Sequence, residues 1–223
     1  MASGPVAAEF WADSALLPHN VMTKRFASLA LLFLFAGAGV ASAETRLKGN
    51  AALDKVIREV SERQKKITSL QTEFRQEKTM ALLAATEVST GTFVFSKPNR
   101  VLWTYHEPKP VTMLIANGWL TTYSPELNRA ERIEVRRFED RIFKYMGAAS
   151  GAIDELGKYF DFTFVDSKSN RYYTLELKPK TKTIAKRVRR IKIWIDRQSY
   201  ITSKFEYEEG DGDMTRYEFT NIR

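Results

Sequence analysis

The chain has 223 residues, of which 43% are hydrophobic and 28% charged. This composition is typical of one sizeable globular domain that buries its own core. The chain contains no cysteine, which excludes disulfides, cysteine nucleophiles, cysteine-ligated zinc and lipidation at a cysteine. The formal net charge of +8 fits acidic partners, such as phospholipid headgroups or nucleic acid, and equally a solvated basic surface without a specific partner.

Residues 22–43 have the order of a secretory signal peptide. A basic start, Met22–Arg25, precedes an apolar run, Phe26–Val40, and the small-residue site Ala41-Ser42-Ala43. The run is shorter than the roughly 20 residues of a comfortable membrane span, although an uncleaved anchor is the alternative. We expect residues 1–21 to be non-structural or a mis-assigned start, with either Met1 or Met22 as the true start. The mature chain then begins near Glu44, as one periplasmic domain over residues 44–223.

The mature chain is expected to begin with an amphipathic helix. Apolar residues recur close to helical spacing at Leu53, Val56, Ile57, Val60, Ile67 and Leu70. From Leu70 onward the period changes to the alternation of strands, clearest in Phe93 to Phe95 and in Val101 to Tyr105. Pro108 and Pro110 interrupt the next connection because proline cannot donate to a sheet ladder.

Asn117-Gly118 lies between two apolar runs, Met113–Ala116 and Trp119–Tyr123. Both residue types tolerate positive φ, so this dipeptide favours the type I′ turn of a tight hairpin. The apolar residues of 138–146 then return to helical spacing. They are followed by a small-residue stretch, 147–151, and by a short helical piece around Ile153 and Leu156. This region is interpreted as a movable flap or as a plain loop between core helices.

Strands resume after this region with short turns between them rather than helical crossovers. The expected strands are centred on 160–165, 172–177, 191–195, 205–207 and 217–219. The fold class is therefore mainly β (α+β), with one curled antiparallel sheet of about nine to eleven strands and two or three helices on one face. The basic run 178–190 is interpreted as a solvated hairpin rather than a nucleic-acid arm, because it lacks aromatic stacking platforms.

The residues argue against an enzyme. The mature chain has a single histidine, His106, which excludes paired-histidine metal sites and most catalytic triads. Two acidic pairs could serve as acid and base, Glu126 with Glu131 and Asp154 with Glu155, but such pairs arise by chance among 27 acidic residues, and we interpret them as solvated surface. No phosphate-binding glycine motif is present. We expect no catalytic residue, no metal and no cofactor.

At this point the sequence resembles a known family, the LolA-type periplasmic carriers of outer-membrane lipoproteins. The resemblance spans roughly Ala51 to Arg223 and is most specific between Gly91 and Pro125. It rests on the first-strand segment 70–76 with Phe74 and Gln76, on Gly91, Lys97-Pro98-Asn99, Val101, Trp103, Pro108 and Asn117-Gly118, and on Tyr123-Ser124-Pro125.

The resemblance implies an unclosed β-barrel, or half-barrel, with a helical lid over an apolar cavity for acyl chains. The expected ligand-binding residues are Phe93, Phe95, Val101, Trp103, Tyr105, Leu114, Phe138, Ile142, Phe143 and Met146. The same residues would also suit a conventional core. The implied function is a monomeric chaperone that shuttles lipoproteins from an inner-membrane release complex to an outer-membrane acceptor, with only transient membrane contact. The alternatives are a carrier of another amphiphile, such as a glycolipid or polyene lipid, a lipid-sensing regulatory module and a lipid-modifying hydrolase.

Two features depart from the family pattern. The family usually has an arginine directly before the proline, which latches the helical lid, and this chain has Lys97. A lysine has a compact ammonium group, whereas an arginine has a planar guanidinium group with several donors in a fixed arrangement. We therefore expect a looser latch. The chain also stops at Arg223, where many members continue, and this leaves the delivery partner and the cargo open.

Overall fold

The computed structural model describes residues 51–136, 153–165 and 171–223. All of these belong to one compact unit, residues 44–223. The expected signal segment, the apolar residues of 138–146 and the small-residue stretch 147–151 lie outside the described residues. They therefore stay predictions.

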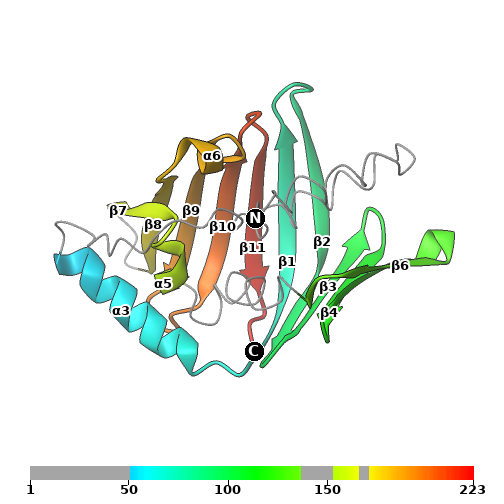
Figure 1. The fold of residues 1–223 in the computed structure, drawn as a ribbon, viewed down its shortest axis with the longest axis horizontal. Coiled ribbons are helices and arrows are strands. Elements are labelled where there is room, and N and C mark those ends of the chain that lie inside the picture. Colours follow the sequence, from blue (N-terminus) through cyan, green and yellow to red (C-terminus); the bar gives the residue numbers. More distant parts are fainter. Residues whose placement is uncertain (1–50, 137–152, 166–170) are drawn as a thin grey trace, which may run out of the picture. The chain divides into compact units, whose positions relative to one another are not determined.

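The described residues form one sheet of eleven antiparallel strands (Figure 1). In chain order the strands are β1 (Ser69–Met80), β2 (Ala85–Ser96), β3 (Arg100–Glu107), β4 (Val111–Ala116), β5 (Trp119–Ser124), β6 (Arg129–Glu134), β7 (Phe160–Val165), β8 (Tyr172–Pro179), β9 (Val188–Asp196), β10 (Thr202–Glu209) and β11 (Met214–Thr220). Their order in the sheet is β6-β5-β4-β3-β2-β1-β11-β10-β9-β8-β7, so β6 and β7 are the two open edges. The sheet does not close, which confirms the predicted fold class.

The described helices are α3 (Ala51–Lys65), α5 (Ile153–Leu156) and α6 (Lys182–Ala185), with a 3-10 turn, η2, at Pro125–Leu127. Helix α3 has the predicted amphipathic pattern, and its apolar side buries Leu53, Val56, Ile57 and Val60. It contacts α5, which Figure 1 shows in front of the β8–β10 part of the sheet. No helix among the described residues is long and apolar enough to cross a bilayer.

Helix α3 ends earlier than its apolar spacing indicated. The backbone amides of Lys66 and Ile67 still reach back to the carbonyls of Arg63 and Gln64, at 3.2 and 3.1 Å. Leu70, however, is already the second residue of β1 and is buried there. Its agreement with helical spacing was coincidental, because a strand that follows a short turn can bury an apolar residue at any offset from the helix.

The two faces of the sheet differ in character, and we name them by one residue. The face that carries Phe74 is called the inner face, and the opposite one the outer face. Phe74 lies opposite Gly91 of β2 and Phe219 of β11. Directly paired residues in antiparallel strands point to the same side, so the registers assign every strand residue to one face.

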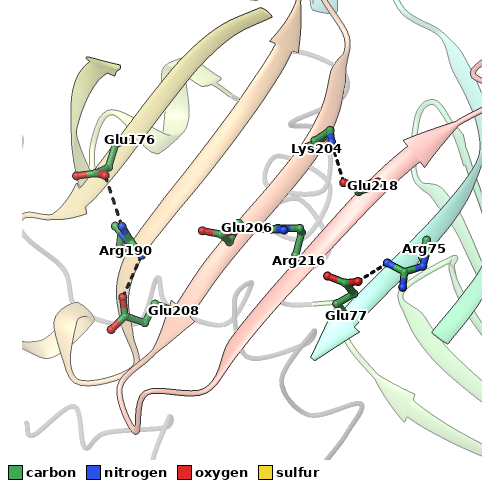
Figure 2. A network of polar contacts seen from close by, with 9 residues as sticks. All are labelled: Arg75, Glu77, Glu176, Arg190, Lys204, Glu206, Glu208, Arg216 and Glu218. Carbon is green, nitrogen blue, oxygen red and sulfur yellow. Dashed lines mark hydrogen bonds and ion pairs between the residues drawn. The ribbon is translucent and has the colours of Figure 1, made fainter. Parts of the chain in front are cut away.

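The outer face carries charges of alternating sign along rows that run across the strands. One such row is Glu77, Arg216, Glu206, Lys192 and Glu176. Figure 2 shows the ion pairs of this region, including Arg216 with Glu206 at 2.6 Å and Lys204 with Glu218 at 2.7 Å. Opposite charges on neighbouring strands are favourable cross-strand pairs. The outer face of β1 and β8–β11 is therefore suited to contact with water.

Several expected connections are confirmed. Asn117 and Gly118 both have positive φ, at 55° and 80°, in the tight turn between β4 and β5. Two elements were not foreseen. Strand β6 is exposed along its whole length, and the basic run 178–190 contains the short helix α6, which Thr181 caps by accepting from the Ile184 amide at 3.3 Å.

Candidate functional site: the inner face of the sheet

Five of the predicted ligand-binding residues come together on the inner face. They are Phe93, Phe95, Val101, Trp103 and Tyr105, and all five are buried. Phe93 pairs with Trp103 and Phe95 pairs with Val101, so the side chains of β2 and β3 lie next to one another on the same side. Four further predicted residues, Phe138, Ile142, Phe143 and Met146, lie outside the described residues.

Leu114 is not part of this group. It pairs with Leu102 of β3 and Thr121 of β5, which places it on the outer face, and it is 40% exposed. Its neighbours Met113 and Ile115 are the residues of β4 that point inward, and both are buried. Strand β4 is apolar on both faces, so its own sequence does not show which residues belong inside.

Packed aromatic rings form the centre of the inner face. The ring of Phe74 lies 5.4 Å from that of Trp103 and 5.0 Å from that of Tyr105, measured between centroids. Trp103 also contacts Phe93 at 4.7 Å and Tyr217 at 5.7 Å. Tilted and edge-to-face pairs such as these add about 0.5–1.5 kcal/mol each beyond their buried area. Four strands are thereby joined through one rigid apolar surface.

Gly91 makes room for this cluster. A Cβ atom at this position would lie 2.0 Å from the Thr104 carbonyl oxygen and 2.6 Å from the ring of Phe74. The pairing of β2 with β3 is also irregular between Thr90 and Gly91, as glycines at bulges often cause. The glycine therefore lets the Phe74 ring lie flat over β2.

The inner face stays apolar across the other half of the sheet. Its buried residues there include Tyr207 of β10, the three isoleucines of β9 at 191, 193 and 195, Leu175 and Leu177 of β8, and Phe162 of β7. Sequence analysis assigned these strands but named none of their residues as binding residues, nor Phe74 or Tyr217. Strand alternation would have identified most of them, since they lie two positions from another inward apolar residue, but the inward neighbours of Phe74 are the polar Thr72 and Gln76.

The polar atoms of the aromatic cluster are few and neutral. The hydroxyl groups of Tyr105 and Tyr217 lie 3.3 Å apart. Burial raises the pKa of Tyr105, Tyr207 and Tyr217 well above the ordinary value, so all three stay protonated at any physiological pH. The buried indole N–H of Trp103 has no hydrogen-bond partner among the described residues.

The comparisons with known proteins assign the family. The family model described as "Outer membrane lipoprotein carrier protein LolA" matches residues 65–223. The chain belongs to this family. No curated protein matches the sequence.

Several solved structures are also similar to this chain in fold. The MucA/MucB complex of Pseudomonas aeruginosa is 14% identical, with a TM-score of 0.48, and the match covers 78% of this chain and 57% of that chain. LppX of Mycobacterium tuberculosis is 10% identical at a TM-score of 0.46, with 78% and 96% covered. A LolA superfamily protein of Nitrosomonas europaea is 10% identical at 0.36, with 75% and 92% covered.

Lys97, the residue predicted as a latch, contacts a helix end in this structure. Its ammonium group donates to the backbone carbonyl of Lys65, the last residue of α3, at 2.7 Å. A cation at a helix C-terminus also interacts favourably with the helix dipole. The observed contact is thus with the N-terminal helix. The predicted contact with a lid over residues 138–146 falls outside the described residues.

The β9–β10 turn holds the same end of α3 from a second direction. The side-chain amide of Gln64 donates to the carbonyl of Tyr200 at 3.1 Å, and the guanidinium of Arg63 lies 5.2 Å from the centroid of the Tyr200 ring. Helix α3 is therefore fastened by side chains from its last turn and by Lys97. The end of the helix is fixed by polar contacts, whereas its middle is fixed by apolar packing.

Proposed function

We propose that this protein binds the acyl chains of lipoproteins on the inner face of its sheet and carries them across the periplasm from the inner to the outer membrane. The observation that carries the proposal is a continuous apolar surface on one side of an unclosed sheet. Membership of the LolA family supports it. The protein acts by binding and release, without catalysis, and it receives its cargo from an inner-membrane complex and hands it to an outer-membrane acceptor.

The energetics explain why such a carrier is needed. Each CH₂ group exposed to water costs about 0.8 kcal/mol, so a single long acyl chain carries a transfer penalty on the order of 10 kcal/mol. A multiply acylated lipoprotein therefore does not cross an aqueous compartment unaided. A protein that covers the chains with apolar side chains removes most of this penalty for the duration of transport.

The side chains on the inner face of β1–β4 suit a flexible hydrocarbon. Rings such as Phe74 and Trp103 offer broad apolar surfaces, and Met113 adds an unbranched side chain that adapts to different shapes. The orphan indole N–H of Trp103 is a donor within this surface. It has no acceptor among the described residues, and a carbonyl oxygen of an acyl ester or amide could serve as one.

Two neighbouring residues of β4 provide a matched test of the binding face. Met113 is buried on the inner face, and Leu114 is on the outer face. Met113→Gln nearly preserves volume but places an amide among apolar groups, which costs about 1–3 kcal/mol. We expect Met113→Gln to weaken the binding of a fluorescent acyl probe about tenfold, while Leu114→Gln leaves binding unchanged. Circular dichroism checks that both variants fold.

The native cargo is identified by mass spectrometry of lipid extracted from protein purified out of its own cell envelope. The proposal expects lipoprotein or acyl chains in the extract. A glycolipid or polyene lipid would keep the carrier function but change the cargo. If no lipid is found, no acyl probe binds saturably and the protein forms a stable complex with a signalling protein, the carrier proposal is wrong and the regulatory alternative is favoured.

A further inference from the structure

The turn between β1 and β2 exposes two leucines to solvent. Leu82 is 94% exposed and Leu83 is 65% exposed, within the apolar run Met80–Ala85. Within the turn, the Leu83 amide donates to the Met80 carbonyl at 3.2 Å. Figure 1 shows this hairpin extending past the neighbouring turns at one end of the sheet. Single exposed leucines are common, but adjacent ones at the tip of a projecting hairpin require a reason.

Two other connections adjoin this tip. The backbone amide of Ala81 donates to the Asp213 carboxylate at 3.0 Å, which joins the tip to the β10–β11 turn. In that turn the amide of Gly210 donates to the carbonyl of Arg187 at 2.8 Å. The β1–β2 tip, the β10–β11 turn and the segment that follows α6 therefore form one continuous end of the sheet, which we call the leucine end: residues 80–85, 182–189 and 210–213.

The leucine end is basic around its leucines. Residues 178–190 contain lysine or arginine at seven positions and no acidic residue. Lys182, Lys186, Arg187 and Arg189 are exposed. The acidic residues of this end are Asp211 and Asp213, and Glu87 of β2 and Glu208 and Glu209 of β10 lie next to it in the chain.

Some of these carboxylates already form ion pairs with lysine and arginine side chains of the sheet. Lys78 lies 3.3 Å from Glu209 and 3.6 Å from Asp213, and Arg189 lies 3.6 Å from Glu208. Lys182 and Lys186 are exposed on and directly after α6, at the same end of the sheet as the apolar tip.

We propose that the leucine end docks on the surface of an anionic phospholipid bilayer. Apolar side chains that enter the boundary between headgroups and acyl chains, with lysine and arginine beside them, are the combination that binds such a surface. Leu82 and Leu83 supply the apolar insertion, and Lys182 and Lys186 supply attraction to the headgroups. This docking goes beyond the carrier proposal, because it does not depend on what the inner face binds.

The absence of cysteine allows a direct test at the tip. We would label Leu82→Cys with an environment-sensitive dye and add vesicles of phosphatidylcholine with phosphatidylglycerol. The same dye on Leu127→Cys is the control, because Leu127 is 57% exposed in the η2 turn between β5 and β6, which β3 and β4 separate from the β1–β2 hairpin in the sheet. We expect a blue shift and a rise in emission for the dye at position 82 only.

A second measurement tests the charge, by flotation of unlabelled full-length protein with the same vesicles. Lys182→Gln with Lys186→Gln should weaken binding about thirtyfold, which corresponds to roughly 1 kcal/mol per cation near an anionic surface. Lys55→Gln with Lys66→Gln removes the same charge from exposed positions on and just after α3, and should have little effect. High salt should weaken binding of the unsubstituted protein.

Three outcomes would overturn the docking proposal. The first is a dye at position 82 that stays in water when vesicles are present, which would leave the tip as a contact for a protein partner. The second is equal binding to neutral vesicles without salt dependence. The third is an equal loss in the α3 control variant. None of these bears on acyl-probe binding, so the carrier proposal stands or falls separately.

Discussion

The packing of the aromatic rings on the inner face depends on the absence of a Cβ atom at Gly91. The Phe74 ring occupies the space where a side chain of β2 would begin, and from there it contacts Trp103 and Tyr105. A larger residue at position 91 would push this ring away and disturb the whole cluster. The glycine is thus part of the site, although it offers no chemistry.

We expect Gly91→Ala to destabilise the protein by about 2 kcal/mol or more, because its Cβ would overlap backbone as well as a packed ring. The free energy of unfolding, measured by urea denaturation, checks this. Thr92→Ala, at the next position on the outer face, is the control and should change stability much less. Equal stability of Gly91→Ala and the parent protein would show that the close approach of Phe74 is not required.

Asp196 orders the turn that supports α3. Its carboxylate accepts from the backbone amides of Ser199 and Gln198, each at 3.0 Å, and from the Ser199 hydroxyl. These bonds, that from the Ser199 amide above all, hold the pKa of Asp196 below its ordinary value of 3.8. The turn then presents the Tyr200 carbonyl to Gln64 of the helix.

The lowered pKa gives this carboxylate a pH-dependent contribution to stability. The contribution is present above the unfolded pKa of about 3.8 and is lost as the pH falls through the lower, folded pKa. Asp196→Asn should therefore cost about 1 kcal/mol at pH 7 and almost nothing at the acid end of the folded range. Thermal unfolding from pH 7 to pH 3 measures the difference. Glu126→Gln, at an exposed position, is the control, and a pH-independent deficit in Asp196→Asn would contradict the assignment.

At the scale of single residues, the sequence predicts which side chains point inward where apolar and polar residues alternate regularly along a strand. Phe93, Phe95 and Trp103 were assigned in this way, and they are buried on one face. Leu114 was misplaced because β4 is apolar on both sides, and only pairing with β3 and β5 decides its face. Cross-strand register depends on contacts between distant segments, which a single strand's sequence does not contain.

Helix α3 is the element whose attachment the structure explains most fully. Apolar residues on one side fix its position, and Lys97 and Tyr200 fix its C-terminal end. Polar contacts at a helix end contribute about 0.5–1.5 kcal/mol each, so they can be broken without unfolding the domain. The C-terminal end of α3 can therefore be released while apolar packing keeps the rest of the helix in place.

We expect Lys97→Leu to loosen this end, because the Lys65 carbonyl loses its donor. Hydrogen exchange of the last-turn amides of α3 should become faster, while Lys97→Arg, which keeps a cationic donor, should stay close to the parent protein. If the bond also favours the empty state, Lys97→Leu should release a bound acyl probe more slowly. Unchanged exchange and unchanged release in Lys97→Leu would contradict a latch at this position.

Element boundaries were predicted only where burial and turn chemistry agree. The β4–β5 hairpin was foreseen from Asn117-Gly118, whose positive φ angles the structure shows. Strand β6 was missed because it buries no residue and so has no periodic pattern. Helix α6 was missed because a four-residue helix within a basic run is too short to show helical spacing.

The molecule as a whole combines an apolar face with a charged face on one sheet. Pairing of opposite charges across the outer face (Figure 2) keeps that side in water, and it leaves the inner face as the surface suited to lipid. Among the described strands the sheet ends at β6 and at β7, so under the carrier proposal the sheet need not enclose a bound lipid completely. A carrier that must both load and unload benefits from this arrangement.

Photo-crosslinking tests the central claim, acyl binding on the inner face, most directly. An acyl ester with a diazirine near the end of its chain would be bound, irradiated and mapped by peptide mass spectrometry. The account predicts adducts on inner-face residues of β1–β4 and β11, such as Phe93, Trp103 and Tyr217, that excess unlabelled lipid abolishes. Adducts confined to the outer face, or to Leu82 and Leu83 at the hairpin tip, would contradict it.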